Sequence, residues 1–183
     1  SKPDEVKLLV LELVLREHGR PVVVYAIPPE DDSMGNPDYK LLPFHWSTKA
    51  NYRINPKNPY GFSVSAVEAN ITTSADTWDK ETTATVFSYT GTTGNSAGKR
   101  DNTNVVSWGA YRAGVIAVTY IWYSGSQILE TDTRMNTLYG WSLSGEAGKF
   151  DVQNIMTHEF GHWVGLADLY ADKDYWLTMY GYA

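Results

Sequence analysis

The chain has 183 residues, a net charge of −6 and a hydrophobic content of 43%. This length and composition suit one domain with an extension and are sufficient for a substantial core. The acidic balance argues against nucleic-acid binding, which needs clustered Lys and Arg. No cysteine is present, which excludes disulfides and is more typical of a secreted prokaryotic protein than of a disulfide-stapled eukaryotic one. We therefore expect an extracellular monomer whose signal peptide is not part of this chain.

Residues 1–40 are predicted to form an N-terminal extension. In residues 4–18, apolar side chains recur at helical spacing before Gly19 and Pro21, which predicts a helix too short to span a membrane. Residues 22–27 predict a strand, and the acidic residues 30–39 mark a linker before a second domain of residues 41–183. The extension is either structural or part of a propeptide. In the second case, the candidates to reach a metal ion are Asp31, Asp32 and Asp38.

The next segments predict strands with one helix inserted among them. A helix is predicted from the capping-box pattern of Ser65 and Glu68 and from the apolar spacing that continues to Trp78. This helix should cover the back of a sheet. Strands are predicted for residues 50–54, 85–89, 104–108, 114–123 and 127–133. The sequence therefore predicts an α+β fold with a twisted mixed sheet.

Residues 151–165 predict a second helix that carries two histidines on one face. Asp151 is a good N-cap, and glycine at Gly165 is a typical helix stop. His158 and His162 are four residues apart, so their side chains can bind one ion, with Glu159 between them. A sharp turn at Gly165 would bring Asp168 to the same ion as third ligand. The apolar stripe of this helix comprises Val152, Ile155, Met156, Phe160 and Trp163.

The pattern His158-Glu159-x-x-His162-x-x-Gly165-x-x-Asp168, followed by Met179, resembles the metzincin clan of zinc endopeptidases. The order of elements is similar to that of matrixins, and the third ligand is aspartate as in the snapalysin-like branch. The resemblance covers residues 41–183. It implies a backing helix, an active-site helix and a methionine turn that places Met179 beneath the zinc. Most of the clan continues past the methionine turn into a further helix, and the four residues given after Met179 are too few to form one.

The resemblance also implies the chemistry. Zn²⁺ would be held by His158, His162 and Asp168, and Glu159 would take a proton from water and pass it to the leaving amine of a protein or peptide substrate. The strand at residues 115–123 would border the cleft and pair with the substrate; an interior strand is the alternative. The candidate substrate contacts are Val115, Ile116, Ala117, Val118, Tyr180 and Tyr182.

Other assignments remain open from the sequence. A thermolysin-like site needs a later glutamate, and none follows Glu159; an aspzincin-like site would use Asp172 or Asp174 instead of Asp168. The acidic residues 168–174 are a candidate Ca²⁺ site, with a solvated loop as the alternative. An alternative from a different functional class is an inactive zinc-binding module for adhesion or carbohydrate binding. Glu159 argues against that class, because a structural zinc site does not need it.

Overall fold

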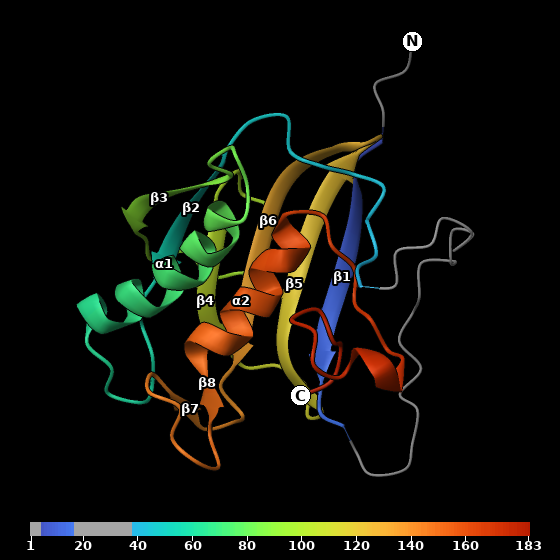
Figure 1. Ribbon diagram of the computed structural model, residues 1–183. Coiled ribbons are helices and arrows are strands. Elements are labelled where there is room, and N and C mark those ends of the chain that lie inside the picture. The colour runs from blue at the N-terminus through green and yellow to red at the C-terminus, as the bar shows by residue number, and fades with distance from the viewer. Residues whose placement is uncertain (1–4, 17–37) are drawn as a thin grey trace.

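The computed structural model describes residues 5–16 and 38–183. In this part of the chain, a six-stranded mixed sheet and two helices form an α+β fold, with both helices against the same face of the sheet (Figure 1). A short two-stranded sheet and one 3-10 turn are also present. The elements are β1 (Lys7–Val14), β2 (Ala50–Asn55), α1 (Val64–Lys80), β3 (Phe87–Thr92), β4 (Asn104–Gly109), β5 (Val115–Ser124), β6 (Gln127–Asn136), β7 (Trp141–Ser142), β8 (Phe150–Asp151), α2 (Val152–Trp163) and η1 (Asp172–Asp174).

The order of strands across the large sheet is β1-β5-β6-β4-β2-β3. Neighbours among β3, β2, β4 and β6 are parallel, whereas β5 runs antiparallel to both β6 and β1. α1 is the crossover between the parallel strands β2 and β3. Since parallel strands must be joined by such a crossover, α1 lies over the sheet and buries one face against it.

The main core fills the space between this sheet face and the two helices. Tyr52 on β2 contacts the rings of Phe160 and Trp163 on α2, which holds the second helix to the sheet. The stripe predicted for α2 is buried as expected, and α1 buries Val67, Ile71 and Ala75 at helical spacing. The sheet contributes Tyr52, Ile54, Val106, Ile116, Ala117 and Met135 to the same core.

The helix predicted for residues 4–18 is wrong wherever the structure describes that segment. Lys7–Val14 is the strand β1, paired antiparallel with β5. Leu11 and Leu13 are buried on the helix side of the sheet, while Leu8 and Val10 remain exposed. Because most residues of β1 are apolar, its sequence fits the strand period of two residues and the helix period of 3.6 residues equally well. The N–H and C=O groups along β5 decide the outcome, since an extended chain satisfies them and a helix cannot.

The remaining element predictions agree closely with the structure. α1 begins at Val64, however, and its N-cap is Ser63, whose hydroxyl accepts from the backbone N–H of Ala66. The predicted capping box is therefore wrong, and Glu68 instead accepts a hydrogen bond from the Tyr89 hydroxyl. The strand predicted for residues 22–27 and most of the predicted linker lie outside the described residues.

β5 is an interior strand, because β1 pairs along one edge and β6 along the other. Of the two alternatives that the sequence left for this strand, the interior position is therefore confirmed and the free cleft edge is wrong. The strand that takes the outer place comes from the predicted N-terminal extension. Residues 7–14 thus belong to the main sheet.

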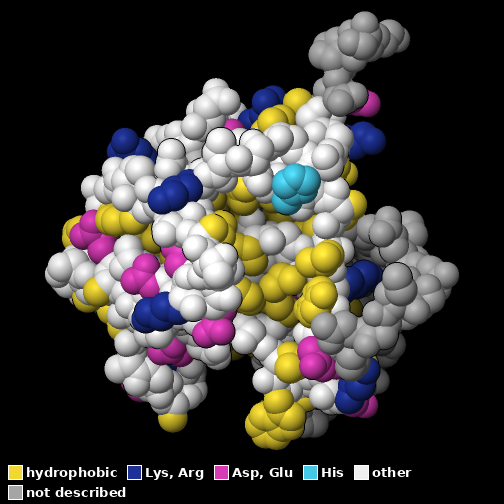
Figure 2. Space-filling model, turned by 45° about the horizontal axis from the view of Figure 1, so that its top comes forward, with side chains coloured by type: hydrophobic (Ala, Val, Ile, Leu, Met, Phe, Trp, Pro, Cys, Tyr) yellow, Lys and Arg dark blue, Asp and Glu magenta, His cyan; other side chains and the backbone are white. Residues whose placement is uncertain are grey.

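Two surface properties bear on partners. In the part of the chain that the structure describes, neither helix has the length and apolar character needed to cross a lipid bilayer. On the face shown in Figure 2, the Lys and Arg side chains of the described residues are scattered among acidic ones and form no continuous basic strip. Hydrophobic side chains gather toward the middle of this face.

Candidate metal centre

α2 carries the candidate site and has well-formed ends. Asp151 caps its N-terminus by accepting from the backbone N–H of Asn154 at 2.9 Å. At the other end, Gly165 has a φ of 89°, and hydrogen bonds run from Leu166 N to Gly161 O and from Gly165 N to His162 O. These two bonds define a Schellman motif, which needs a left-handed residue and therefore favours glycine. The stop reverses the chain toward the helix, as predicted.

This reversal brings Asp168 to the two histidines. Its Oδ1 lies 3.1 Å from Nε2 of His158 and 3.5 Å from Nε2 of His162. The ligand atoms of all three residues lie within 4.8 Å of one another, and all three residues are buried. The structure thus brings together the three predicted ligands, which come from two separate segments of the chain.

Each ligand is oriented by a second hydrogen bond. Nδ1 of His158 lies 2.8 Å from the carbonyl oxygen of Thr178, and Nδ1 of His162 lies 2.8 Å from that of Leu166. A carbonyl only accepts, so each Nδ1 carries a hydrogen, and in a neutral imidazole Nε2 then presents its lone pair toward Asp168. Oδ2 of Asp168 accepts from the Tyr170 hydroxyl at 3.2 Å, which leaves Oδ1 free. With neutral imidazoles, the three inward-facing atoms are therefore all acceptors.

When both imidazoles are neutral, the inward-facing atoms have no hydrogen-bond donor among the described residues. They are Nε2 of both histidines, Oδ1 of Asp168 and one oxygen of Glu159, Oε1, and each is buried. Buried acceptors without a donor are costly unless a cation lies between them. Two imidazole nitrogens and one carboxylate oxygen form a ligand set suited to Zn²⁺ that leaves a fourth position open. The residues present therefore fit a zinc ion.

The ionisation of the site reflects its burial and its internal charges. Burial alone would lower the pKa of His158, but the hydrogen bond and charge of Asp168 outweigh it and raise this pKa to about 9. Burial lowers the pKa of His162 to about 4. Burial would raise the pKa of Asp168, but the two histidines hold it below its usual range. Without a metal, one proton on His158 thus balances the carboxylate, and a divalent cation has to displace that proton.

Glu159 is held by a chain of hydrogen bonds from the sheet. Its Oε2 accepts from the hydroxyl of Thr119 on β5 at 2.6 Å. Thr119 Oγ1 lies 2.7 Å from Thr133 Oγ1 on β6, which in turn accepts from the indole N–H of Trp163 at 2.9 Å. An indole N–H only donates, and the Glu159 carboxylate accepts. Thr133 therefore donates to Thr119, and Thr119 donates to Glu159, so the chain of hydrogen bonds runs from Trp163 to Glu159. Burial raises the pKa of Glu159 to about 7, although His158 and this hydrogen bond act in the opposite direction.

Met179 packs against the middle of the metal-site helix. A side-chain carbon added at Gly161, between the two histidines, would lie 2.2 Å from the Met179 sulfur and 2.9 Å from the Trp78 ring. The backbone carbonyl of Met179 accepts from Leu169 N, and the carbonyl before it orients His158. The turn at residues 178–179 thus couples α2 to the segment that carries Asp168.

We expect Gly161→Ala to lower the free energy of unfolding by about 1–3 kcal/mol, because the new methyl group would have to displace Met179 or Trp78. Chemical denaturation of the metal-free protein would measure the change. Gly94→Ala is the matched control, since no atom lies within 4 Å of the added carbon there. Equal stability of the two variants would contradict this packing.

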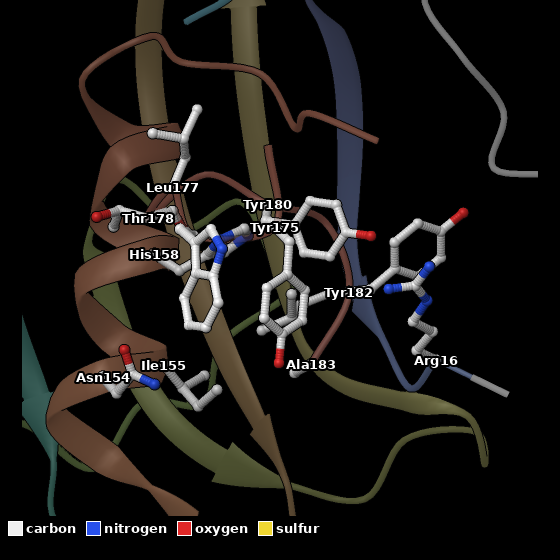
Figure 3. A pocket seen from close by; sticks show the side chains of 12 residues that line it. Arg16, Asn154, Ile155, His158, Tyr175, Leu177, Thr178, Tyr180, Tyr182 and Ala183 are labelled. Atoms are coloured by element: carbon white, nitrogen blue, oxygen red, sulfur yellow. The ribbon is translucent and has the colours of Figure 1, made fainter. Parts of the chain in front are cut away.

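A cavity of about 370 Å³ lies beside the ligand group (Figure 3). One wall is formed by α2 residues, including His158 and Ile155, and the opposite wall by residues 175–183. Leu13 and Arg16, at the end of β1, complete the lining. Of the two predicted tyrosine contacts, Tyr180 is buried and Tyr182 half-buried, and both line this cavity. The side chains of Val115, Ile116, Ala117 and Val118 are fully buried in the sheet.

Several groups that contact the candidate ligands or Glu159 were not predicted from the sequence, because they reach the site only through tertiary contacts. They are Thr119, Thr133 and Tyr170 and the backbone carbonyls of Leu166 and Thr178. Asp172 does not join the ligands; it is exposed and pairs with Arg16 at 2.8 Å. Asp38 is exposed, and Asp31 and Asp32 lie outside the described residues. Within the described ranges, the ligand group is the only cluster of metal-binding side chains, and neither Asp174 nor any other residue of the acidic run forms a second one.

Comparison with protein-family models finds no match, and a search of curated proteins finds none either. The chemistry of this site therefore has to be inferred from its own geometry.

Proposed function

We propose that this protein is a zinc-dependent endopeptidase of the metzincin type, with His158, His162 and Asp168 as zinc ligands. The observation that carries this proposal is the group of buried, unpartnered acceptors with a free carboxylate oxygen, Glu159 Oε1, beside it. A structural site of two imidazoles and a carboxylate would not need that fourth group. The same residues form the sequence pattern that resembles metzincins.

When bound, zinc supplies Lewis-acid chemistry: it acidifies a water molecule and polarises a carbonyl oxygen. Glu159 is suited to be the proton carrier. Its Oε2 is fixed by Thr119 and its Oε1 is free beside the ligand group, so this carboxylate is held where it can accept a proton from water and return it. In this proposal Glu159 takes the proton of the attacking water and passes it to the leaving amine.

The arrangement of the helices supports the same family. A mixed sheet with a backing helix, and a methionine that packs against the metal-site helix, agree with what the resemblance implies. We accordingly propose that the methionine turn at Met179 stabilises the metal-site helix from below.

Zinc-loaded protein should cleave an unfolded protein such as casein, and protein treated with a chelator should not. Mass spectrometry under non-denaturing conditions should find one zinc ion per chain. Cleavage is measured with the unmodified chain and with variants that loosen β1, since the end of this strand lines the cavity beside His158. A zinc-loaded protein whose β1 is demonstrably open and which still leaves casein intact would contradict the proposal.

A further inference from the structure

We propose that this chain closes its own candidate site by laying strand β1 along the edge of β5, where the resemblance implies that an extended substrate would pair. The site is then closed in the folded protein and opens only when β1 leaves. The inference rests on the proposed function, because it names what controls access to that site. It concerns only residues that the structure describes.

The backbone of β1 pairs along most of this edge, with one irregularity between Leu13 and Val14. Lys7 pairs with Tyr123, and the register continues to Val14, opposite Val115. Each backbone N–H and C=O group along an edge can serve one neighbouring strand, so a second peptide cannot pair there while β1 is in place. A peptide that docks by strand addition must therefore displace β1.

The end of β1 is enclosed from both sides. Leu15 N donates to the carbonyl of Gly114 at 2.9 Å, beside β5. On the other side, Val14 O accepts from Ala183 N at 3.0 Å, and Arg16 N donates to Ala183 O at 3.2 Å. Residues 14–16 thus lie as an extended segment between β5 and residues 181–183, next to the cavity that contains His158 (Figure 3).

The inward side chains of β1 flank the ligand group. Leu11 packs in a buried cluster with Ala167, the neighbour of Asp168. Leu13, two residues later, lines the cavity with His158 and also belongs to the main core. Bulky aliphatic side chains at alternating positions thus reach the surroundings of both the aspartate and a histidine. A peptide that replaces β1 should present similar side chains at the same spacing.

The burial of the site agrees with a closed state. The four inward atoms of His158, Glu159, His162 and Asp168 are all buried, whereas a peptide carbonyl has to approach them in the reaction. β1 is also a strand that can separate. It is the edge strand of its sheet, and Leu8 and Val10 on its outer face are 50% and 36% exposed. Edge elements open at lower free energy than the interior of a fold.

A reversible cross-link tests this inference in the full chain. The chain has no cysteine, and Val10 and Tyr120 lie opposite each other in the register. Both side chains point to the sheet face away from the helices, because residues 11 and 119 point toward them. Val10→Cys combined with Tyr120→Cys should form a disulfide that holds β1 on β5. A phosphine reductant, which brings no thiol to compete for zinc, opens it again.

We expect the oxidised form to cleave casein, and to release zinc to EDTA, about tenfold or more slowly than the reduced form of the same variant. Hydrogen exchange of the β1 and β5 amides should slow in parallel. The single variant Val10→Cys is the control and should not respond to oxidation.

A second pair of variants loosens the strand. Leu11→Ala removes an inward side chain, and Leu8→Ala removes an exposed one from the same strand. Leu11→Ala should speed up casein cleavage, zinc release and hydrogen exchange of β1 by about tenfold or more, and Leu8→Ala should leave all three near the values of the unmodified chain.

The outcomes separate the two proposals. Equal zinc release, equal exchange and equal cleavage in the oxidised and reduced forms would overturn the role of β1. A second outcome is that zinc release and hydrogen exchange are slower with the cross-link than without it, but no open form cleaves casein. This outcome would support β1 as the strand that closes the site and would overturn the endopeptidase function.

Discussion

Replacing Glu159 with glutamine should lower the rate of casein cleavage by about a hundredfold to ten-thousandfold, while one zinc ion per chain stays bound. Glutamine has nearly the same shape, and its amide can still pair with the Thr119 hydroxyl that fixes Glu159 Oε2. It cannot accept a proton from water. Because Glu159 is not among the three ligands that converge on one point, zinc affinity should change little.

The measurement is the initial rate of cleavage together with the zinc content of each variant. Glu146→Gln is the matched control, since Glu146 is exposed and pairs with Lys149 at the surface. Both changes should also be made in the Leu11→Ala background, so that closure by β1 does not limit the rate. A Glu159→Gln protein that keeps zinc and cleaves casein at the rate of the control would exclude Glu159 as proton carrier.

Zinc should stabilise the fold strongly, and this effect should depend on His162. The three ligand atoms are buried and converge on one point in the folded state, and the unfolded chain does not retain this arrangement, so we expect the ion to bind the folded state. With free zinc at about a thousand times its dissociation constant, the free energy of unfolding should rise by about 4 kcal/mol. For a chain of this size, the midpoint of thermal unfolding should then rise by about 8–16 °C.

Thermal unfolding with and without EDTA measures this shift. His162→Ala should remove it, because His162 is fully buried and its Nε2 faces the site. His45→Ala is the control, since His45 is exposed and lies outside the ligand group. A zinc-dependent shift of the same size in both variants would show that the stabilising ion binds elsewhere.

The metal-site helix is the part that the sequence determined best. The N-cap at Asp151, the buried stripe of α2, and the stop at Gly165 were all predicted and are all confirmed. Capping and left-handed glycine are properties of a few neighbouring residues, so they can be derived from local sequence. The spacing of His158 and His162 follows from the same local geometry. The convergence of Asp168 was predicted from the turn at Gly165, which again is local.

The N-terminal segment and the surroundings of Glu159 were decided by tertiary structure. Residues 7–14 carry an apolar pattern that fits both a helix and a strand, and only the N–H and C=O groups of β5 select the strand. Thr119 and Thr133 lie on strands that were predicted correctly, yet their contact with Glu159 depends on how the sheet packs against α2. Local sequence thus determined the candidate ligands and their helix. The packing of the sheet determined that Thr119 orients Glu159, and the pairing of strands determined that β1 lies along β5 beside the site. The physical reason is that caps and helix periodicity are satisfied within one segment, while the partners of an edge strand come from elsewhere in the chain.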